Sequence, residues 1–395
     1  MISQEASRIG KGLHVVLASR VFAPEPAAAS LRLTALVTAL ANADHRVTVL
    51  TTTTPDQGGY ELPAGVVVKR WPVLRDRDGY VRGYLQYLSF DVPLALRLLG
   101  IRGADVVVVE PPPTTGLIAA VVTWLRRTPF VYYAADVWSD AVVSAGMSGV
   151  VAKVLRVLER RVLRAARVVL ATSAGVAKRV RALGAEATEV GNGVDTTVFT
   201  PVGSAVDCSG PYLVYTGTAS EVHGADVFTR AMAQVHASRP DARLVVIGQG
   251  SDLPEMRRQV AGLPPDTVTF LPRMAPEEVA EWIRGAQAAL ASVLPGPYAF
   301  AFPSKVYAAA ACGTPVVFAG EGPARELIAR GELGQVVDHD VDKVAAAMIA
   351  ALKDADGAGS PAERQRRARW AAQHVSAAAA ARRAVAQIEQ AAGSR

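Results

Sequence analysis

The chain has 395 residues, of which half are hydrophobic and 20% are charged, so it carries enough apolar material for two domain cores. Its net charge of +6 favours anionic partners. The arginines are scattered, and no zinc-finger, RNP or homeodomain pattern is present, so nucleic acid is not an expected partner. With only Cys208 and Cys312, a disulfide framework is excluded, and no apolar run is long enough to span a membrane. We therefore expect a cytoplasmic protein.

The first half of the chain alternates between short apolar runs and segments with helical periodicity. This alternation is typical of parallel sheets whose strands are joined by helices. The opening strand leads through small and proline residues into a helix and a second strand, which makes one βαβ unit. The strands are predicted at Leu13–Ala18, Arg46–Thr51, Val66–Arg70, Ala104–Val109, Phe130–Ala134, Val168–Ala171 and Glu186–Val190.

The second half repeats this opening, with a strand that ends at Gly217, a helical segment, and a strand that ends at Gly248. Two such openings predict two Rossmann-like domains with parallel sheets facing a cleft, and a ligand at the carboxyl ends of the strands. The strands are predicted at Tyr212–Thr216, Ala242–Ile247, Val268–Phe270, Ala288–Ser292, Pro315–Phe318 and Gly334–Val337.

The domain boundaries are read from composition. The segment Thr200–Gly210 is rich in Pro, Gly, Ser and Asp, as interdomain linkers often are. We therefore expect an N-terminal domain over 1–203 and a C-terminal domain over 204–372. Residues 373–395 are expected to form a helix that crosses back onto the first domain.

One segment, Arg70–Arg102, departs from the alternation of apolar runs and helical segments because it is both basic and aromatic. One interpretation is an ordinary loop and helix with a solvated basic face. The other is a contact patch for an anionic lipid or for an acceptor. The sequence leaves both open.

Several motifs resemble those of the family-4 glycosyltransferases over about residues 12–390. The most specific is Val190-Gly-Asn-Gly-Val-Asp-Thr-Thr-Val-Phe-Thr-Pro201. Gly248-Gln-Gly-Ser-Asp-Leu253 resembles the family's G-x-G-x-x-L turn, and Pro303-Ser-Lys305 followed by Gly313-Thr-Pro315 resembles a donor loop. The resemblance implies the GT-B fold and transfer of a sugar, with retention, from a nucleotide-diphosphate sugar. It further implies that the N-terminal domain (1–203) binds the acceptor and that the C-terminal domain (204–372) binds the nucleotide sugar. It also implies UDP as the nucleotide and no metal or other cofactor.

The same resemblance, together with the chemistry of the residues, indicates a donor site. A diphosphate is held by backbone N–H groups and cations, and glycines at strand ends allow the backbone to approach it closely. Lys305 is the strongest candidate, because a lysine in an alanine-rich apolar loop requires an anion. The candidate donor-binding residues are Gly217, Thr218, His223, Gly248, Gly250, Arg273, Ser304 and Lys305.

The acceptor side is expected in the first half. Asp136 follows a strand, and it is either the catalytic base or the N-cap of the helix after it. Glu25, Pro26 and Ala27 lie in the first loop, where the resemblance implies acceptor contacts. The acceptor is either lipid-linked or a small soluble molecule. The basic segment Arg70–Arg102 allows a peripheral location at an anionic membrane, the inner face of the plasma membrane.

The chain also departs from the family pattern. Phe300 and Ala308 stand where the family has two glutamates, and Thr218 and His223 stand where it has cations. One alternative is therefore a catalytically degenerate protein that binds nucleotide sugars as a scaffold. A dinucleotide oxidoreductase is disfavoured, because the first turn lacks G-x-G-x-x-G and no acidic residue ends the second strand.

Overall fold

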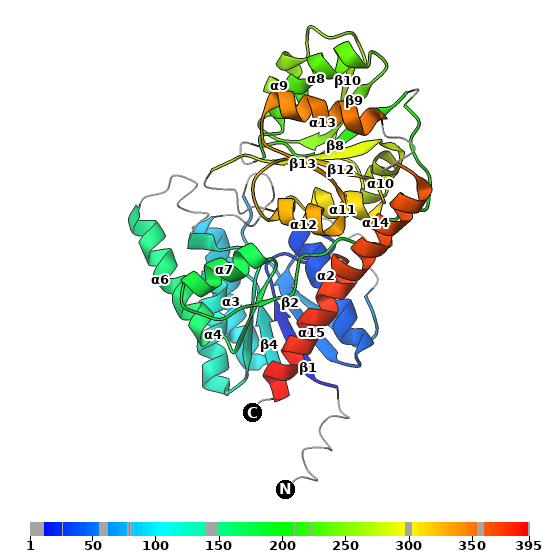
Figure 1. The fold of residues 1–395 in the computed structure, drawn as a ribbon. Helices are drawn as coiled ribbons and strands as arrows, with labels where there is room; N and C mark the ends of the chain where they lie inside the picture. Colours follow the sequence, from blue (N-terminus) through cyan, green and yellow to red (C-terminus); the bar gives the residue numbers. More distant parts are fainter. Residues whose placement is uncertain are drawn as a thin grey trace. The chain divides into compact units, whose positions relative to one another are not determined.

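The computed structural model describes residues 12–25, 27–54, 62–76, 79, 81, 83–139, 149–208, 210–220, 223–296, 302–353 and 359–393. These residues form two α/β units, each with a parallel sheet (Figure 1). The N-terminal unit comprises residues 1–192 and 380–395, and the C-terminal unit comprises residues 193–379. Every predicted strand overlaps an observed one, so the predicted α/β class with parallel sheets is confirmed.

The sheet of the N-terminal unit has seven strands in the order β3-β2-β1-β4-β5-β6-β7. Its central strands are apolar along their whole length because helices cover both faces. Val15 and Leu17 of β1 face one core, while Val16 and Ala18 face the other. The strands are β1 (His14–Ala18), β2 (Arg46–Thr52), β3 (Val66–Trp71), β4 (Val106–Val109), β5 (Phe130–Ala134), β6 (Val168–Ala171) and β7 (Thr188–Glu189).

Helices cover each face of this sheet. On one face lie α2 (Ala28–Asn42) and the last helix, α15 (Ala377–Gly393), whose Ile388 joins the core. His45 Nε2 lies 3.0 Å from Glu389 Oε1 and ties α15 to the loop before β2. The other face is covered by α3 (Tyr84–Gly100), α4 (Pro113–Arg126), α6 (Gly149–Ala165) and α7 (Ala174–Ala182). The helix α4 packs against both α3 and α6.

The sheet of the C-terminal unit has six strands in the order β10-β9-β8-β11-β12-β13, again all parallel. The strands are β8 (Tyr212–Thr218), β9 (Arg243–Gln249), β10 (Val268–Leu271), β11 (Ala288–Val293), β12 (Val316–Gly320) and β13 (Gly334–Val337). One face packs against α8 (Asp226–Ser238), α9 (Leu253–Gln259) and α13 (Val341–Lys353). The other packs against α10 (Pro276–Gly285), α11 (Lys305–Ala311), α12 (Pro323–Gly331) and α14 (Pro361–His374).

The chain passes between the units at positions that differ from the expected linker. Thr200–Gly210 belongs to the C-terminal unit, because Arg284 of α10 donates hydrogen bonds to the carbonyls of Thr200 and Ser204. The first boundary therefore lies earlier, between residues 192 and 193. The helix α14 also stays with the C-terminal unit, where Arg367 Nε donates to the Gly313 carbonyl at 2.9 Å. The chain returns to the N-terminal unit at residue 380.

The strand order marks one edge of each sheet as a place for ligands. The order reverses between β1 and β4 in the first sheet, and between β8 and β11 in the second. The connections leave such a point in opposite directions, which opens a crevice at the carboxyl ends of the strands. Among the described residues, no helix is long and apolar enough to span a bilayer.

Candidate functional site

In the C-terminal unit, glycines line the carboxyl ends of β8 and β9. Gly248 and Gly250 have φ of +145° and +148°, values that favour glycine. A Cβ on Gly248 would lie 2.1 Å from the Gly217 carbonyl oxygen, and one on Gly250 would lie 1.8 Å from that of Ala219. These two glycines therefore let the strand ends run side by side, which is a structural role. Gly217, with φ +101°, has more room. A Cβ added to it would meet Lys305 Cε first, at 3.8 Å.

Lys305, the first residue of α11, is the most informative side chain of this edge. Its Nζ is shielded from solvent, and it has no hydrogen-bond partner among the described residues. It lies 3.7 Å from the ring centroid of Tyr215, whose hydroxyl is held by the Thr218 carbonyl at 2.8 Å. Burial lowers the pKa of Lys305 to about 7. A buried ammonium with only a ring face beneath it is a favourable site for an anion.

His223 lies in the electrostatic field of this lysine. Its Nδ1 is 2.9 Å from Ser220 Oγ. Burial, followed by the charge of Lys305, lowers the pKa of His223 to about 4. The imidazole is therefore neutral at physiological pH, and it is a hydrogen-bonding group rather than a second cation.

The structure brings some of the predicted donor residues together and separates others. Gly217 and Thr218 end β8 beside Lys305, and both are exposed. Ser304 is exposed at the N-cap of α11, and its side chain makes no capping hydrogen bond. Arg273 follows β10, the edge strand that is two strands away from β8, and it is exposed. Lys305, with the end of β8 and His223, thus forms the centre of this group.

In the N-terminal unit, a cluster of polar side chains lies at the carboxyl ends of β1 and β4. The sequence did not indicate this cluster. Glu110 follows β4, and its Oε1 accepts a hydrogen bond of 3.0 Å from Arg32 Nε of α2. Ser19, which follows β1, donates to Oε2 at 3.4 Å, and Arg32 also donates to Asn192 Oδ1 at 3.3 Å. Both members of the ion pair are buried. A carboxylate directly after an all-valine strand was the available sequence signal.

Arg20 is the second buried cation of the N-terminal unit. Its guanidinium lies 4.2 Å from the ring centroid of Tyr87, and it donates to the Val81 carbonyl at 3.0 Å. Its Nε has no partner among the described residues. Burial lowers the pKa of this guanidinium.

Two further buried polar groups lie in the layer that contains Arg20. Asp91 of α3 accepts a hydrogen bond of 2.6 Å from Thr115 Oγ1, while its Oδ2 has no partner among the described residues. Burial raises the pKa of Asp91. The hydroxyl of Tyr132, on β5, is buried and also lacks a partner within the described part of the chain. Donors and acceptors that lack partners are costly unless something polar satisfies them.

Asp136 follows β5 and is exposed. The N-cap interpretation predicts that its carboxylate receives the first amides of the next helical turn. Those amides, of Trp138 and Ser139, instead donate to the Glu159 carboxylate at 2.8 and 3.1 Å. Glu159, and not Asp136, therefore caps this turn. The role of Asp136 as a catalytic base stays a prediction.

The predicted first-loop residues are held by the fold. Both carboxylate oxygens of Glu25 accept hydrogen bonds from Arg75, at 3.2 and 3.4 Å. Ala27 is the N-cap of α2 and has no side-chain cap. Pro26 and Phe300 lie outside the described residues.

Three arginines of the segment Arg70–Arg102 are turned toward acceptors of the protein itself. Arg70 donates to the carbonyls of Thr52 and Ala23, and Arg97 donates to those of Thr51 and Lys69. With the pair between Arg75 and Glu25, these cations hold strands and loops together. These three arginines therefore have a structural role, whereas Arg102 is exposed.

Comparison with known proteins agrees with this architecture. Residues 28–193 match the family described as "Glycosyl transferase 4-like domain", and residues 210–354 match "Glycosyl transferases group 1". The chain is 32% identical over 189 residues to the D-inositol 3-phosphate glycosyltransferase of Pseudarthrobacter chlorophenolicus. That match covers 44% of this chain and 44% of the relative, so it spans less than half the length of either protein.

Solved structures resemble the chain over almost its whole length. Sucrose-phosphate synthase from Thermosynechococcus elongatus has a TM-score of 0.72 at 19% identity, and the match covers 96% of this chain and 98% of that one. Anabaena HepE (Alr3699), solved in complex with UDP and glucose, has a TM-score of 0.67 at 16% identity, with 95% and 99% covered. At these identities the likeness concerns the fold.

Two parallel-sheet units, each with its strand order reversed beside the first strand, define the GT-B class of fold. The two family matches together cover most of the chain. The chain belongs to the family-4 glycosyltransferases.

Proposed function

We propose that this protein transfers a sugar from a nucleotide-diphosphate sugar to the hydroxyl of an acceptor. The observation that carries this proposal is the buried Nζ of Lys305, which has no hydrogen-bond partner among the described residues and lies beside Gly217. A glycosyl transfer releases a nucleoside diphosphate, and the negative charge on that leaving group grows as the bond to the sugar breaks. A cation already in place stabilises that charge without reorganisation.

The donor half of the reaction is assigned to the C-terminal unit. Lys305 contacts the diphosphate, Gly217 and Thr218 supply close backbone approach, and neutral His223 donates or accepts a hydrogen bond. Ser304 presents its hydroxyl at the start of α11, and Arg273 is a second cation at the same edge of the sheet. The proposed nucleotide is UDP, and the complex of the structurally similar HepE with UDP and glucose supports this choice.

The acceptor half is assigned to the N-terminal unit. The partnerless polar atoms of Arg20, Asp91 and Tyr132 suit a polyhydroxylated acceptor, which fits the name of the curated relative that acts on D-inositol 3-phosphate. The acceptor oxygen forms a bond to the anomeric carbon as the bond to the diphosphate breaks. The proton of that hydroxyl passes to Asp136, and retention at the anomeric carbon is part of the proposal.

The second candidate function is nucleotide-sugar binding without turnover. Ala308, at the family's acidic position, is buried in α11 among apolar neighbours, so no carboxylate is presented there for the donor ribose. This observation favours weaker donor binding or a lost reaction. We propose turnover over binding alone, because the buried Nζ of Lys305 is placed to stabilise the charge that develops on the leaving diphosphate. We also propose a cytoplasmic location, since both cysteines are free thiols.

The test measures binding and turnover separately. Thermal unfolding is followed with UDP, GDP, ADP and TDP and their sugars, since a ligand of the folded state raises the melting temperature. Release of nucleoside diphosphate is then measured across phosphorylated and lipid-linked polyols. A shift with one nucleotide and its release in the presence of an acceptor are expected. A shift without release across the panel would favour the scaffold function, and the absence of any shift would contradict the donor site.

Asp136→Asn separates chemistry from donor binding. Loss of a general base lowers turnover by about 10²- to 10⁴-fold, while the nucleotide-induced rise in melting temperature stays unchanged. Asp44→Asn is the matched control, because Asp44 belongs to the same unit and its left-handed backbone, with φ +59°, accepts asparagine. Wild-type turnover in the Asp136 variant would remove this residue from the reaction.

A further inference from the structure

The outward face of α3 is apolar along its whole length. Its exposed side chains recur every three or four residues, which places them on one side of the helix. They are Tyr84, Leu85, Leu88, Val92, Leu96 and Leu99, with exposed fractions from 48% to 71%. The two charged residues of α3 are turned elsewhere: Asp91 is buried, and Arg97 is bonded to backbone carbonyls. No exposed residue of this helix is charged.

Exposed apolar residues continue across the two helices that follow in the same layer, since α4 packs against both α3 and α6. Trp124 of α4 is 77% exposed. The remaining members are Val121 and Leu125 on α4, and Val150, Val154 and Val157 on α6. With the six residues of α3, these form what we call the apolar face. Exposed apolar residues gathered on adjacent helices indicate an interaction site.

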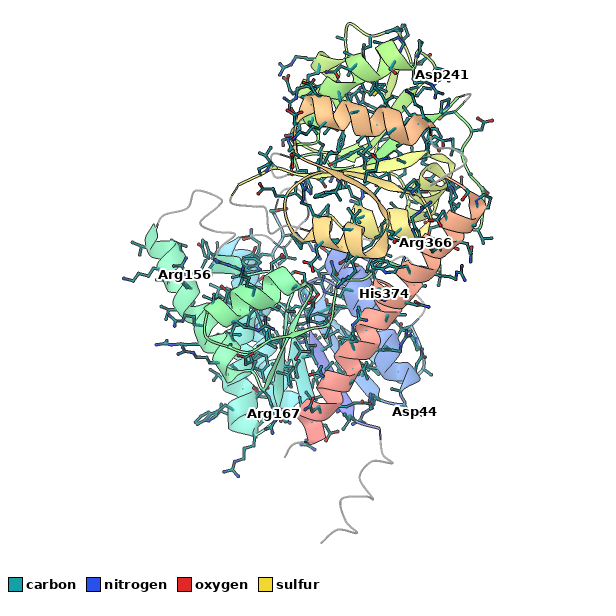
Figure 2. The ribbon with its side chains drawn as sticks, viewed as in Figure 1. Asp44, Arg156, Arg167, Asp241, Arg366 and His374 are labelled. Atoms are coloured by element: carbon teal, nitrogen blue, oxygen red, sulfur yellow. The ribbon has the colours of Figure 1, made fainter. Side chains whose placement is uncertain are left out.

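The charges beside the apolar face have one sign. The only carboxylates within α3, α4 and α6 are Asp91 and Glu159, and they are 1% and 2% exposed. The exposed charged side chains of α6 are all cationic, and Figure 2 labels Arg156 among them. They are Lys153, Arg156, Arg160, Arg161 and Arg164. Arg127, directly after α4, is also exposed.

We propose that the apolar face is a docking surface for an anionic lipid bilayer. The leucines and valines enter the boundary between headgroups and acyl chains, and the cations of α6 contact the headgroups. Trp124 and Tyr84 are the aromatic types that favour this interface. A second copy of the chain is a poorer occupant, because a two-fold contact brings the same surface together and places cations near cations.

This inference does not depend on the proposed transfer reaction, since it concerns helices of the N-terminal unit and none of the donor residues. It also differs from the basic patch expected at Arg70–Arg102. In that segment Arg70, Arg75 and Arg97 bond to the protein itself, while the four exposed leucines of α3 face outward.

The test is flotation of the full chain with vesicles of phosphatidylcholine alone or with added phosphatidylglycerol. We expect binding to the anionic vesicles, weakened by salt because the surface charges are screened. Leu88→Gln combined with Leu96→Gln is expected to weaken binding more than tenfold. Lys153→Gln combined with Arg156→Gln is expected to weaken it about 30-fold, and to remove most of the preference for anionic lipid.

Leu31→Gln is the matched control, because Leu31 is a leucine of α2, on the opposite face of the sheet, and is 64% exposed. It is expected to bind like the wild type, and all variants are expected to keep their melting temperature, since the changed residues are exposed. Equal binding by the leucine variant and the wild type would overturn the proposal. So would absence of vesicle binding, or a wild-type dimer in sedimentation that the leucine variant dissociates.

Discussion

Replacing Lys305 with methionine is expected to remove tight binding of the nucleoside diphosphate and to raise the stability of the free protein at the same time. The lysine Nζ is buried, has no hydrogen-bond partner among the described residues, and has a pKa lowered to about 7 by burial. Methionine fills a similar space without a charge that must be desolvated. Loss of a charge-assisted contact of about 1.5–3 kcal/mol corresponds to a roughly 10- to 150-fold weaker affinity for the diphosphate.

Calorimetric titration with the diphosphate and thermal unfolding of the ligand-free variant measure the two effects. Lys343→Met is the control, because this lysine is exposed in the same unit and pairs with Asp338 at 2.6 Å. It is expected to leave diphosphate affinity unchanged. If Lys305→Met binds the diphosphate like the wild type, the donor site does not include Lys305.

The same lysine predicts how diphosphate affinity depends on pH. In the free protein Lys305 loses its proton as the pH rises through about 7, whereas a bound diphosphate favours the charged form. Binding therefore takes up a proton above pH 7, and affinity is expected to fall up to about tenfold per pH unit between 7 and 9. His223, with a pKa of about 4, stays neutral across this window. A flat affinity profile in the wild type, or an equal fall in Lys305→Met, would contradict this assignment.

The stability of the free protein depends on pH in the opposite direction from diphosphate affinity. The pKa of Lys305 is about 7 in the folded protein, against an ordinary value of 10.5, so the unfolded chain binds more protons between these values. The stability of the free protein is therefore expected to gain a contribution from this group as the pH rises from 7 toward 10.5. The gain is absent in Lys305→Met, which provides a second measurement of the same group.

Glu110→Ala is expected to destabilise the N-terminal unit by about 3–5 kcal/mol, because it leaves the buried guanidinium of Arg32 without its counter-ion. Ser19 loses an acceptor in the same change. Thermal or urea unfolding measures the effect. Adding Arg32→Met to Glu110→Ala is expected to recover much of the lost stability, since no uncompensated charge then remains.

Glu255→Ala is the control for this ion pair. Its partner Arg258 is in the C-terminal unit, and both side chains are substantially exposed. Exposed pairs contribute less than about 1 kcal/mol, so little change is expected. A Glu110 variant that is no less stable than the Glu255 variant would show that the buried pair does not support the fold.

The pattern of apolar runs was sufficient to predict both sheets, because strands buried on both faces must be apolar along their whole length. Val106–Val109 and Ala288–Val293 are clear cases. The glycine motifs indicated the ends of β8 and β9, since the close approach of Gly248 to Gly217 excludes any Cβ. Lys305 was also visible in the sequence, as an isolated cation in an alanine-rich stretch.

Other features depended on contacts between residues far apart in the chain. The pairing of Arg32 with Glu110 and the capping of Trp138 by Glu159 join separate elements, and no local pattern encodes them. The linker region was assigned by composition, but hydrogen bonds from Arg284 attach it to the C-terminal unit.

In the segment Arg70–Arg102, some properties follow from the sequence and others from the tertiary structure. Its amino acids determined that it is basic and aromatic, and the helical repeat of α3 determined that some leucines share one side. Only the tertiary structure decided which side faces solvent. The carbonyls of β2 and β3 are within reach of Arg70 and Arg97, so these two cations turn inward, while four of the leucines of α3 are left exposed. A sequence specifies which side chains share a helix face, but the neighbouring elements decide which face is covered.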